Sequence, residues 1–130
     1  MKCGNISKQM KMKICFKFET VSVTVSGDYY QVMFHDGLDT VDEPYFMIQT
    51  QFEFPDGGVC YFESHKENLI EHSRAKSVLL TTNKLRLSYG EKQHRDVEIE
   101  FNVDSTGFQE LASTLKEMIP ETKIEVQSKC

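Results

Sequence analysis

Hydrophobic and polar residues alternate over much of the first hundred positions, with the period of two that is typical of half-buried β-strands. Residues 10–19 place methionine, isoleucine and phenylalanine at even positions and mainly lysine at odd ones. After Thr20 the apolar positions become the valines of 21–25, and this shift of one residue predicts a bulge or a bend between two sheets. The Gly-Asp pair at 27–28 predicts a turn into a further strand at 29–34.

The clearest hairpin of the sequence follows a polar segment at 35–44, which reads HDGLDTVDEP. Residues 45–54 alternate again, with aromatic and aliphatic side chains at even positions and mainly glutamine and glutamate at odd ones. Pro-Asp-Gly-Gly at 55–58 is a strong turn signal, and 59–64 returns as a strand. We therefore expect these two strands to pair.

The second half of the chain is less regular. Residues 65–77 are polar, and the pattern fits either a long connection or a short helix. Asn-Lys at 83–84 separates two apolar segments, 78–82 and 85–89. These segments are predicted to form either a hairpin or one long strand. A polar turn precedes another alternating strand at 97–103.

Near the C-terminus the hydrophobic period changes from two to three and four residues, which predicts an amphipathic helix. Its apolar positions are Phe108, Leu111, Leu115, Met118 and Ile119. Asp104 or Ser105 is the expected N-cap, and Pro120 ends the helix. Residues 123–126 are a candidate edge strand. The order of elements predicts an α+β fold with a curved, mostly antiparallel β-sheet, a sandwich or half-barrel of about seven strands, and one C-terminal helix packed on it.

Length and composition favour a single folded domain over residues 1–130, with residues 1–12 a candidate flexible segment. The chain is 39% hydrophobic and 27% charged, which is close to ordinary globular usage. No run approaches the ~18 apolar residues of a membrane span, and the lysine-containing start lacks the apolar core of a signal peptide. We expect a cytoplasmic protein that acts away from membranes.

The net charge of −5 conceals a strong asymmetry along the chain. Residues 1–17 carry five lysines and no acid, whereas residues 18–65 carry nine acids and no lysine or arginine. Residues 66–130 are nearly balanced, with ten bases and eleven acids. An acidic stretch of this kind repels nucleic acid, because nucleic-acid binding depends on neutralising phosphates. It either attracts a basic partner or is a solvated face without a partner.

The four cysteines are Cys3, Cys15, Cys60 and Cys130, and their wide spacing matches neither a disulfide framework nor a zinc knuckle. We expect four thiols, with Cys15 and Cys60 acting as small core or sheet residues. A metal site would have to use Cys60, His65 and His72 with Glu67 or Glu71, at spacings that match no usual zinc pattern. The sequence therefore predicts no metal and no other cofactor.

Signals for catalysis are weak. Glu63 and His65 share a strand face as a conceivable acid–base pair, but the sequence shows no pocket that would shift their pKa values. Cys60 lies inside an expected strand, not at a helix N-terminus that would activate a thiol opposite His35 or His65. The acids of 36–43 lack the order of a calcium loop. We therefore expect that this protein is not an enzyme.

The same acidic segment is more plausible as a docking surface, because it joins carboxylates to an aromatic residue, as binding hot spots often do. The predicted contact residues are Asp36, Asp39, Asp42, Glu43, Tyr45, Glu53 and Asp56.

Several motifs over residues 29–119 resemble a known family. They are the strand YFMIQTQFEF with its return VCYFES, the segment SVLLTTNKLRLSYG, and the acidic strand that enters a helix in DVEIEFNVDSTGFQELASTLKEMI. This order is similar to immunity protein family 10 of bacterial toxin–immunity systems, including those of contact-dependent growth inhibition.

The resemblance implies a non-catalytic cytosolic protein that binds the toxic C-terminal domain of an effector, often a nuclease, and covers its active site or substrate channel. It implies no fixed binding residues, so the site has to come from the charge pattern. A basic nuclease domain would complement the acidic stretch. The alternatives are a protein-binding adaptor without a toxin partner and a small ligand-binding domain.

Overall fold

The computed structural model describes residues 11–27, 29–36, 44–51, 59–91 and 93–127. These residues form one nine-stranded sheet and one α-helix, so the predicted α+β class is confirmed. In chain order the elements are β1 (Lys11–Lys17), β2 (Thr20–Val25), β3 (Tyr29–His35), β4 (Tyr45–Gln51), β5 (Val59–Ser64), the 3₁₀ helix η2 (Glu67–Leu69), β6 (Glu71–Leu80), β7 (Lys84–Tyr89), β8 (His94–Glu100), α1 (Ser105–Met118) and β9 (Ile124–Val126). No helix among these residues is long and apolar enough to span a membrane.

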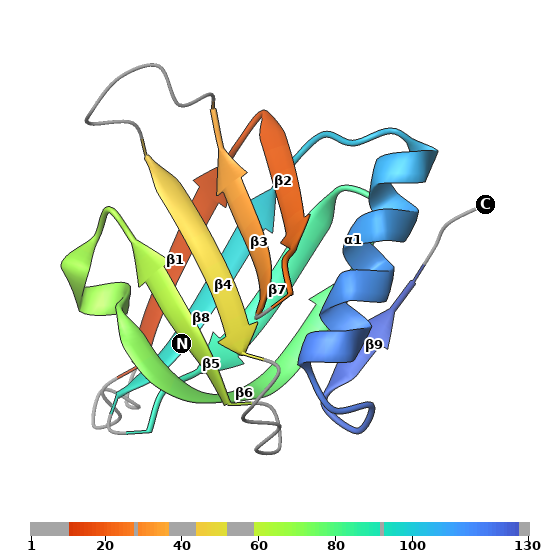
Figure 1. Cartoon of the computed structure of the whole chain (residues 1–130). Helices are drawn as coiled ribbons and strands as arrows, with labels where there is room; N and C mark the ends of the chain where they lie inside the picture. The colour runs from red at the N-terminus through yellow and green to blue at the C-terminus, as the bar shows by residue number, and fades with distance from the viewer. Residues whose placement is uncertain (1–10, 28, 37–43, 52–58, 92, 128–130) are drawn as a thin grey trace.

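The sheet curves into two facing layers (Figure 1). Its strand order is β1-β8-β7-β6-β5-β4-β3-β2, and β9 adds to β6. Pairing is antiparallel except for the parallel pairs β1–β8 and β6–β9. Strands β2 to β5 form the front layer and β1, β7, β8 and β9 the back layer. β6 belongs to both, because its first residues pair with β5 and its later residues with β7 and β9.

The chain crosses between the layers at Phe18 and Glu19, where β1 ends and β2 begins. This is the position at which the hydrophobic pattern shifts by one residue, so the predicted bend between sheets is confirmed. The Phe18 ring is buried and stacks on the ring of Phe16 at a centroid distance of 5.3 Å. The backbone N–H of Phe18 donates to the carbonyl of Glu100 at 2.8 Å, which holds the bend against the end of β8.

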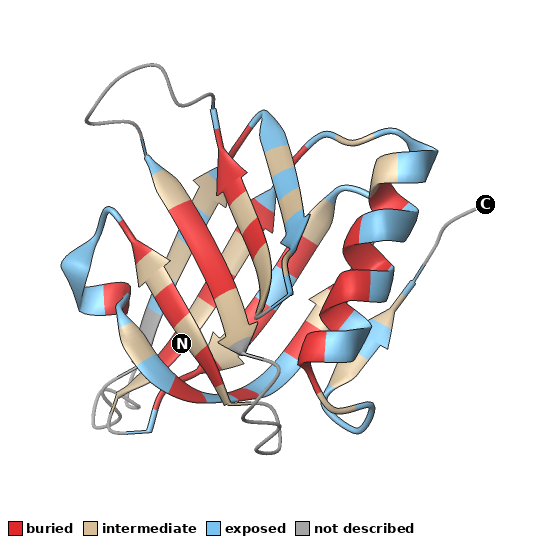
Figure 2. Ribbon diagram, viewed as in Figure 1, coloured by how far each residue is buried: buried red, intermediate tan, exposed pale blue. Residues whose placement is uncertain are grey.

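Buried residues alternate with less buried ones along the strands (Figure 2), and the side chains of the buried residues form one hydrophobic core. The Phe62 ring of the front layer stacks on the Tyr89 ring of the back layer at 3.9 Å between centroids. Cys60 lies buried in this core as predicted, whereas Cys15 is exposed on β1. Burying aromatic rings of this size contributes a large share of the hydrophobic stabilisation of a small domain.

The C-terminal helix and the last strand agree with the sequence pattern. Asp104 is the N-cap of α1, and its carboxylate accepts a hydrogen bond from the backbone N–H of Gly107 at 2.7 Å. Leu111 and Leu115 are fully buried, and α1 packs against β3 and β2. β9 pairs with β6 as the expected extra strand.

Residues 65–77 contain a short helix, which was one of the two alternatives read from the sequence, but more of the segment is strand than either alternative allowed. They hold the short η2 and then the first seven residues of β6. Ser73 and Ala75 are the inward-facing residues there, and a register shift lies between Ala75 and Ser77. Because these inward residues are small and the register shifts, the first half of β6 lacks the regular alternation of large apolar residues that predicts a strand.

Arg95 connects this segment to the back layer. Its Nε donates to the carbonyl of Asn68 at 2.7 Å, and its guanidinium forms an ion pair with Glu71. The Tyr89 hydroxyl donates to the carbonyl of Leu69 at 2.6 Å. Gly90 allows the turn beside this network, because it has φ +118 and a Cβ there would lie 2.0 Å from the carbonyl oxygen of Gln93.

Candidate functional site

Two of the predicted docking residues lie together at one end of the front layer. Asp36 is exposed directly after β3, and Tyr45 is the first residue of β4. The antiparallel pairing of His35 with Tyr45 places both at the same end of the sheet. The Asp36 carboxylate accepts a hydrogen bond from the backbone N–H of Glu19 at 2.9 Å, which adds the start of β2 to this end.

The other five predicted residues, Asp39, Asp42, Glu43, Glu53 and Asp56, lie outside the described residues. The segments that hold them are attached at opposite ends of β4, because 37–43 precedes this strand and 52–58 follows it. A strand of seven residues is roughly 20 Å long. Their participation in one surface stays a prediction.

Tyr45 is part of a cluster on the outer face of the front layer that the sequence did not indicate. Its hydroxyl donates to the Glu63 carboxylate on β5 at 2.7 Å. The register of β4 with β5 pairs Met47 with Glu63, so Glu63 is the diagonal neighbour of Tyr45. Tyr61, two residues before Glu63, is on the same face of β5. We call Tyr45, Tyr61 and Glu63 the tyrosine–glutamate cluster.

The negative charge of Glu63 affects both phenols of this cluster. Burial raises the pKa of Tyr45 to about 12, and the hydrogen bond to Glu63 and its charge act in the same direction. The pKa of Tyr61 is raised by burial and then by the charge of Glu63 and a hydrogen bond to it. Both tyrosines are therefore neutral donors at physiological pH, and Glu63 supplies the charge of the cluster.

Imidazole rings extend the cluster on two sides. The His72 ring lies 4.7 Å from the Tyr61 ring, and the His65 ring lies 6.2 Å from the Tyr45 ring. The Nδ1 atom of His65 accepts a hydrogen bond from the backbone N–H of Tyr45 at 3.1 Å. Glu63 and His65, considered above as an acid–base pair, thus both contact Tyr45.

The residues considered for metal binding or nucleophilic catalysis do not converge. No group of three metal-binding side chains occurs among the described residues. Cys60 points inward from β5, whereas His72 lies on the outer face of β6 opposite Tyr61. Burial raises the pKa of the Cys60 thiol to about 12, so it is protonated at neutral pH.

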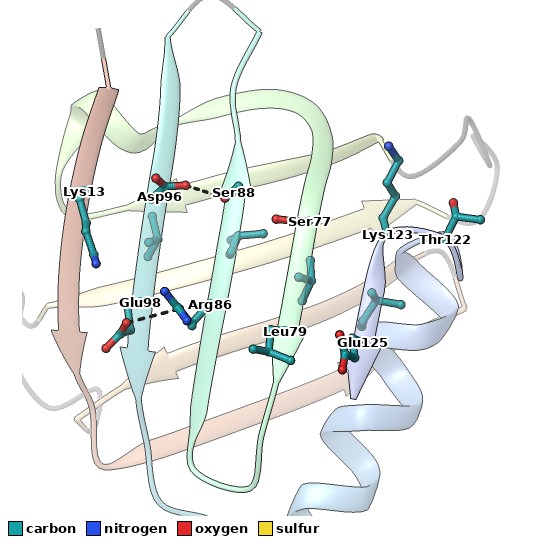
Figure 3. Close-up of a pocket in the computed structure, with 14 residues that line it drawn as sticks. Lys13, Ser77, Leu79, Arg86, Ser88, Asp96, Glu98, Thr122, Lys123 and Glu125 are labelled. Carbon is teal, nitrogen blue, oxygen red and sulfur yellow. Dashed lines mark hydrogen bonds and ion pairs between the residues drawn. The ribbon is translucent and has the colours of Figure 1, made fainter. Parts of the chain in front are cut away.

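A second feature is an open hollow of about 600 Å³ on the outer face of the back layer, which the sequence did not reveal (Figure 3). β6, β7 and β8 form its floor, and Lys13 and Lys123 stand on opposite sides of it. Charged side chains of both signs line it and form ion pairs with their neighbours. The Glu98 carboxylate lies 3.4 Å from Nζ of Lys84 and 3.6 Å from Nε of Arg86. Since these charges compensate one another, the hollow carries no strong field for a charged partner.

Comparison of the chain with models of known families, with curated proteins and with solved structures finds no match. The resemblance to an immunity protein family stays a prediction, and the function has to be argued from the charges and the site.

Proposed function

We propose that this chain is a protein-binding domain that binds and neutralises a basic protein, as an immunity protein does with its toxin domain. Contact is made through the end of the front layer that holds Glu19, Asp36, Tyr45 and Glu63, which we call the acidic end. The proposal rests chiefly on one observation. Residues 18–65, with nine acids and no lysine or arginine, supply all four strands of the front layer.

This arrangement separates charge in space as well as in sequence. β1, which carries Lys11, Lys13 and Lys17, pairs with β8 in the back layer. Among the described residues, strands β2 to β5 and their ends carry Glu19, Asp36 and Glu63 and no lysine or arginine, a charge balance that favours a basic partner and speeds its association. Protection against a toxin requires fast and tight association, and immunity complexes reach the practical limit of non-covalent affinity.

The acidic end also has the composition of a binding hot spot. Tyr45 and Tyr61 present large aromatic surfaces next to a carboxylate, and such residues contribute strongly when a partner excludes water from them. The resemblance of the sequence motifs to an immunity family adds the specific role, which is to cover the active site or substrate channel of a toxin, for instance a nuclease.

A growth assay tests this proposal. Where a toxin-like C-terminal domain is encoded next to this chain, that domain is expressed in a sensitive bacterium, with and without the chain. We expect survival only when the chain is present, and co-purification of the two proteins. Killing that the chain does not relieve, together with no complex, would contradict the immunity role and favour an adaptor with another partner.

A further inference from the structure

We propose that the tyrosine–glutamate cluster is a binding site for one arginine side chain of the partner. The inference rests on the proposed function for the identity of the partner, but its chemistry is tested separately below. Tyr45 and Tyr61 supply aromatic faces, and Glu63 supplies the carboxylate that meets the guanidinium.

The first argument is that Glu63 is held in place before any ligand arrives. Its carboxylate accepts the Tyr45 hydroxyl at 2.7 Å, and both residues lie on paired strands. Met47, the direct cross-strand partner of Glu63, is only 7% exposed, so Glu63 has a packed neighbour on the same face of the sheet. A positioned carboxylate loses little side-chain entropy on binding, and this favours affinity.

The second argument is that no described cationic side chain compensates the charge of Glu63. Two acids on the neighbouring strands β6 and β8 have cationic partners: Glu71 pairs with Arg95, and Glu98 pairs with Lys84 and Arg86. Among the described residues, no lysine or arginine forms an ion pair with Glu63. The hydrogen bond from the neutral Tyr45 phenol orients this carboxylate and leaves its negative charge in place.

The third argument is the shape of the surroundings. Aromatic rings border Glu63 on two sides, because Tyr45 on β4 contacts it and Tyr61 precedes it on β5; the His72 ring lies 4.7 Å from that of Tyr61, and the His65 ring lies 6.2 Å from that of Tyr45. A guanidinium is planar, stacks on aromatic faces and pairs with a carboxylate through two N–H groups, whereas an ammonium is a strongly hydrated point charge. The cluster therefore favours arginine over lysine.

The test uses small probes with the intact chain. N-acetyl-arginine amide, the corresponding lysine compound and the neutral isostere N-acetyl-citrulline amide are titrated separately. Chemical shifts of the Tyr45 and Tyr61 side chains are followed by NMR. We expect saturable shifts with the arginine probe, weaker binding of the lysine probe and none of the citrulline probe. Equal shifts with citrulline, or no shifts with arginine, would overturn the site.

Two variants make the test specific. Glu63→Gln keeps the shape and removes the charge, so we expect arginine binding to weaken about tenfold or more, as for a lost charge-assisted hydrogen bond. Tyr45→Phe keeps the ring and removes the hydroxyl that orients Glu63, so we expect a smaller loss. Glu121→Gln removes an exposed carboxylate after α1 and serves as the matched control. Equal weakening by Glu63→Gln and Glu121→Gln would overturn the proposal.

The outcomes also separate this inference from the proposed function. If the toxin domain binds and Glu63→Gln leaves its affinity unchanged, the arginine site is wrong and the immunity role stands. If the arginine probe binds at the cluster and no toxin domain is neutralised, the site stands and the immunity role is wrong.

Discussion

At the scale of single residues, Arg95 joins parts of the fold that are distant in sequence. Its side chain is buried, donates a hydrogen bond to the carbonyl of Asn68 and forms an ion pair with Glu71. The guanidinium carbon also lies 5.7 Å from the centre of the Tyr89 ring. Removing one member of a buried ion pair is costly because the other charge is left without a partner.

We therefore expect Arg95→Met to lower the free energy of unfolding by about 3 kcal/mol. Methionine fills much of the volume of the arginine stem. The lost free energy of unfolding therefore comes from the missing hydrogen bond and ion pair and not from a cavity. Urea denaturation measures the change. Arg86→Met is the matched control, since the Arg86 side chain is 59% exposed and its pair with Glu98 is worth less than about 1 kcal/mol. Equal losses in the two variants would contradict the role given to Arg95.

Because of Cys60, the free energy of unfolding depends on pH in the alkaline range. Burial raises the pKa of its thiol from 9.0 to about 12 in the folded protein. Because the folded state favours the neutral thiol, this contribution to stability is complete below pH 9 and is lost as the pH rises toward 12. We expect wild-type stability to fall between pH 9 and pH 10 and Cys60→Ala to fall less steeply over the same interval. Urea denaturation at both pH values checks this, and identical slopes would refute it.

At the scale of elements, the N-cap of α1 gives a quantitative prediction. The Asp104 carboxylate accepts the Gly107 N–H, one of the otherwise unpaired donors at the helix start. We expect Asp104→Ala to cost about 1 kcal/mol of unfolding free energy. Ser105→Ala, one residue later and inside the helix, is the control and should change little. A comparable loss in both variants would contradict the assignment of the effect to the Asp104 cap, because alanine itself has the highest helix propensity.

The hydrophobic pattern predicted most elements because large side chains alternate regularly in them. The bend before β2, the β4–β5 pairing and α1 follow from the hydrophobic pattern, and the cap Asp104 was one of two candidates. β6 did not follow, because its first inward positions hold Ser73 and Ala75 and its register then shifts. The hydrophobic periodicity of a short segment therefore does not predict a strand such as β6, which passes from one layer to the other.

The candidate site was predictable only in part for a related reason. Tyr45 and Asp36 stand out by residue type and chain position. Glu63 and Tyr61 join Tyr45 through the register of β4 with β5, which places Glu63 diagonally across from Tyr45. That register depends on the length of the connecting turn, and the sequence pattern does not fix it.

At the scale of the whole molecule, the change of layer coincides with a change in the sign of charge. The lysines of β1 lie in the back layer, and the chain becomes acidic at Glu19, where it enters the front layer. The central claim is that this acidic layer, and its acidic end in particular, binds a basic protein.

Binding kinetics and calorimetry with the proposed partner, a basic toxin domain encoded beside this chain, test the claim most directly when done at low and high salt. The variant Glu19→Gln, Asp36→Asn, Glu63→Gln removes three charges from the acidic end. Asparagine at position 36 retains an oxygen that accepts the Glu19 N–H. The control Glu110→Gln, Glu117→Gln, Glu121→Gln removes three charges from exposed positions on and after α1.

We predict tight binding of the wild-type chain that weakens with salt, association at least ~10-fold slower for the acidic-end variant, and a flatter salt dependence for it. The control should stay within about twofold of wild type, because electrostatic steering depends on where the charges lie. Equal effects of the two variants, or binding that salt does not change, would contradict the account.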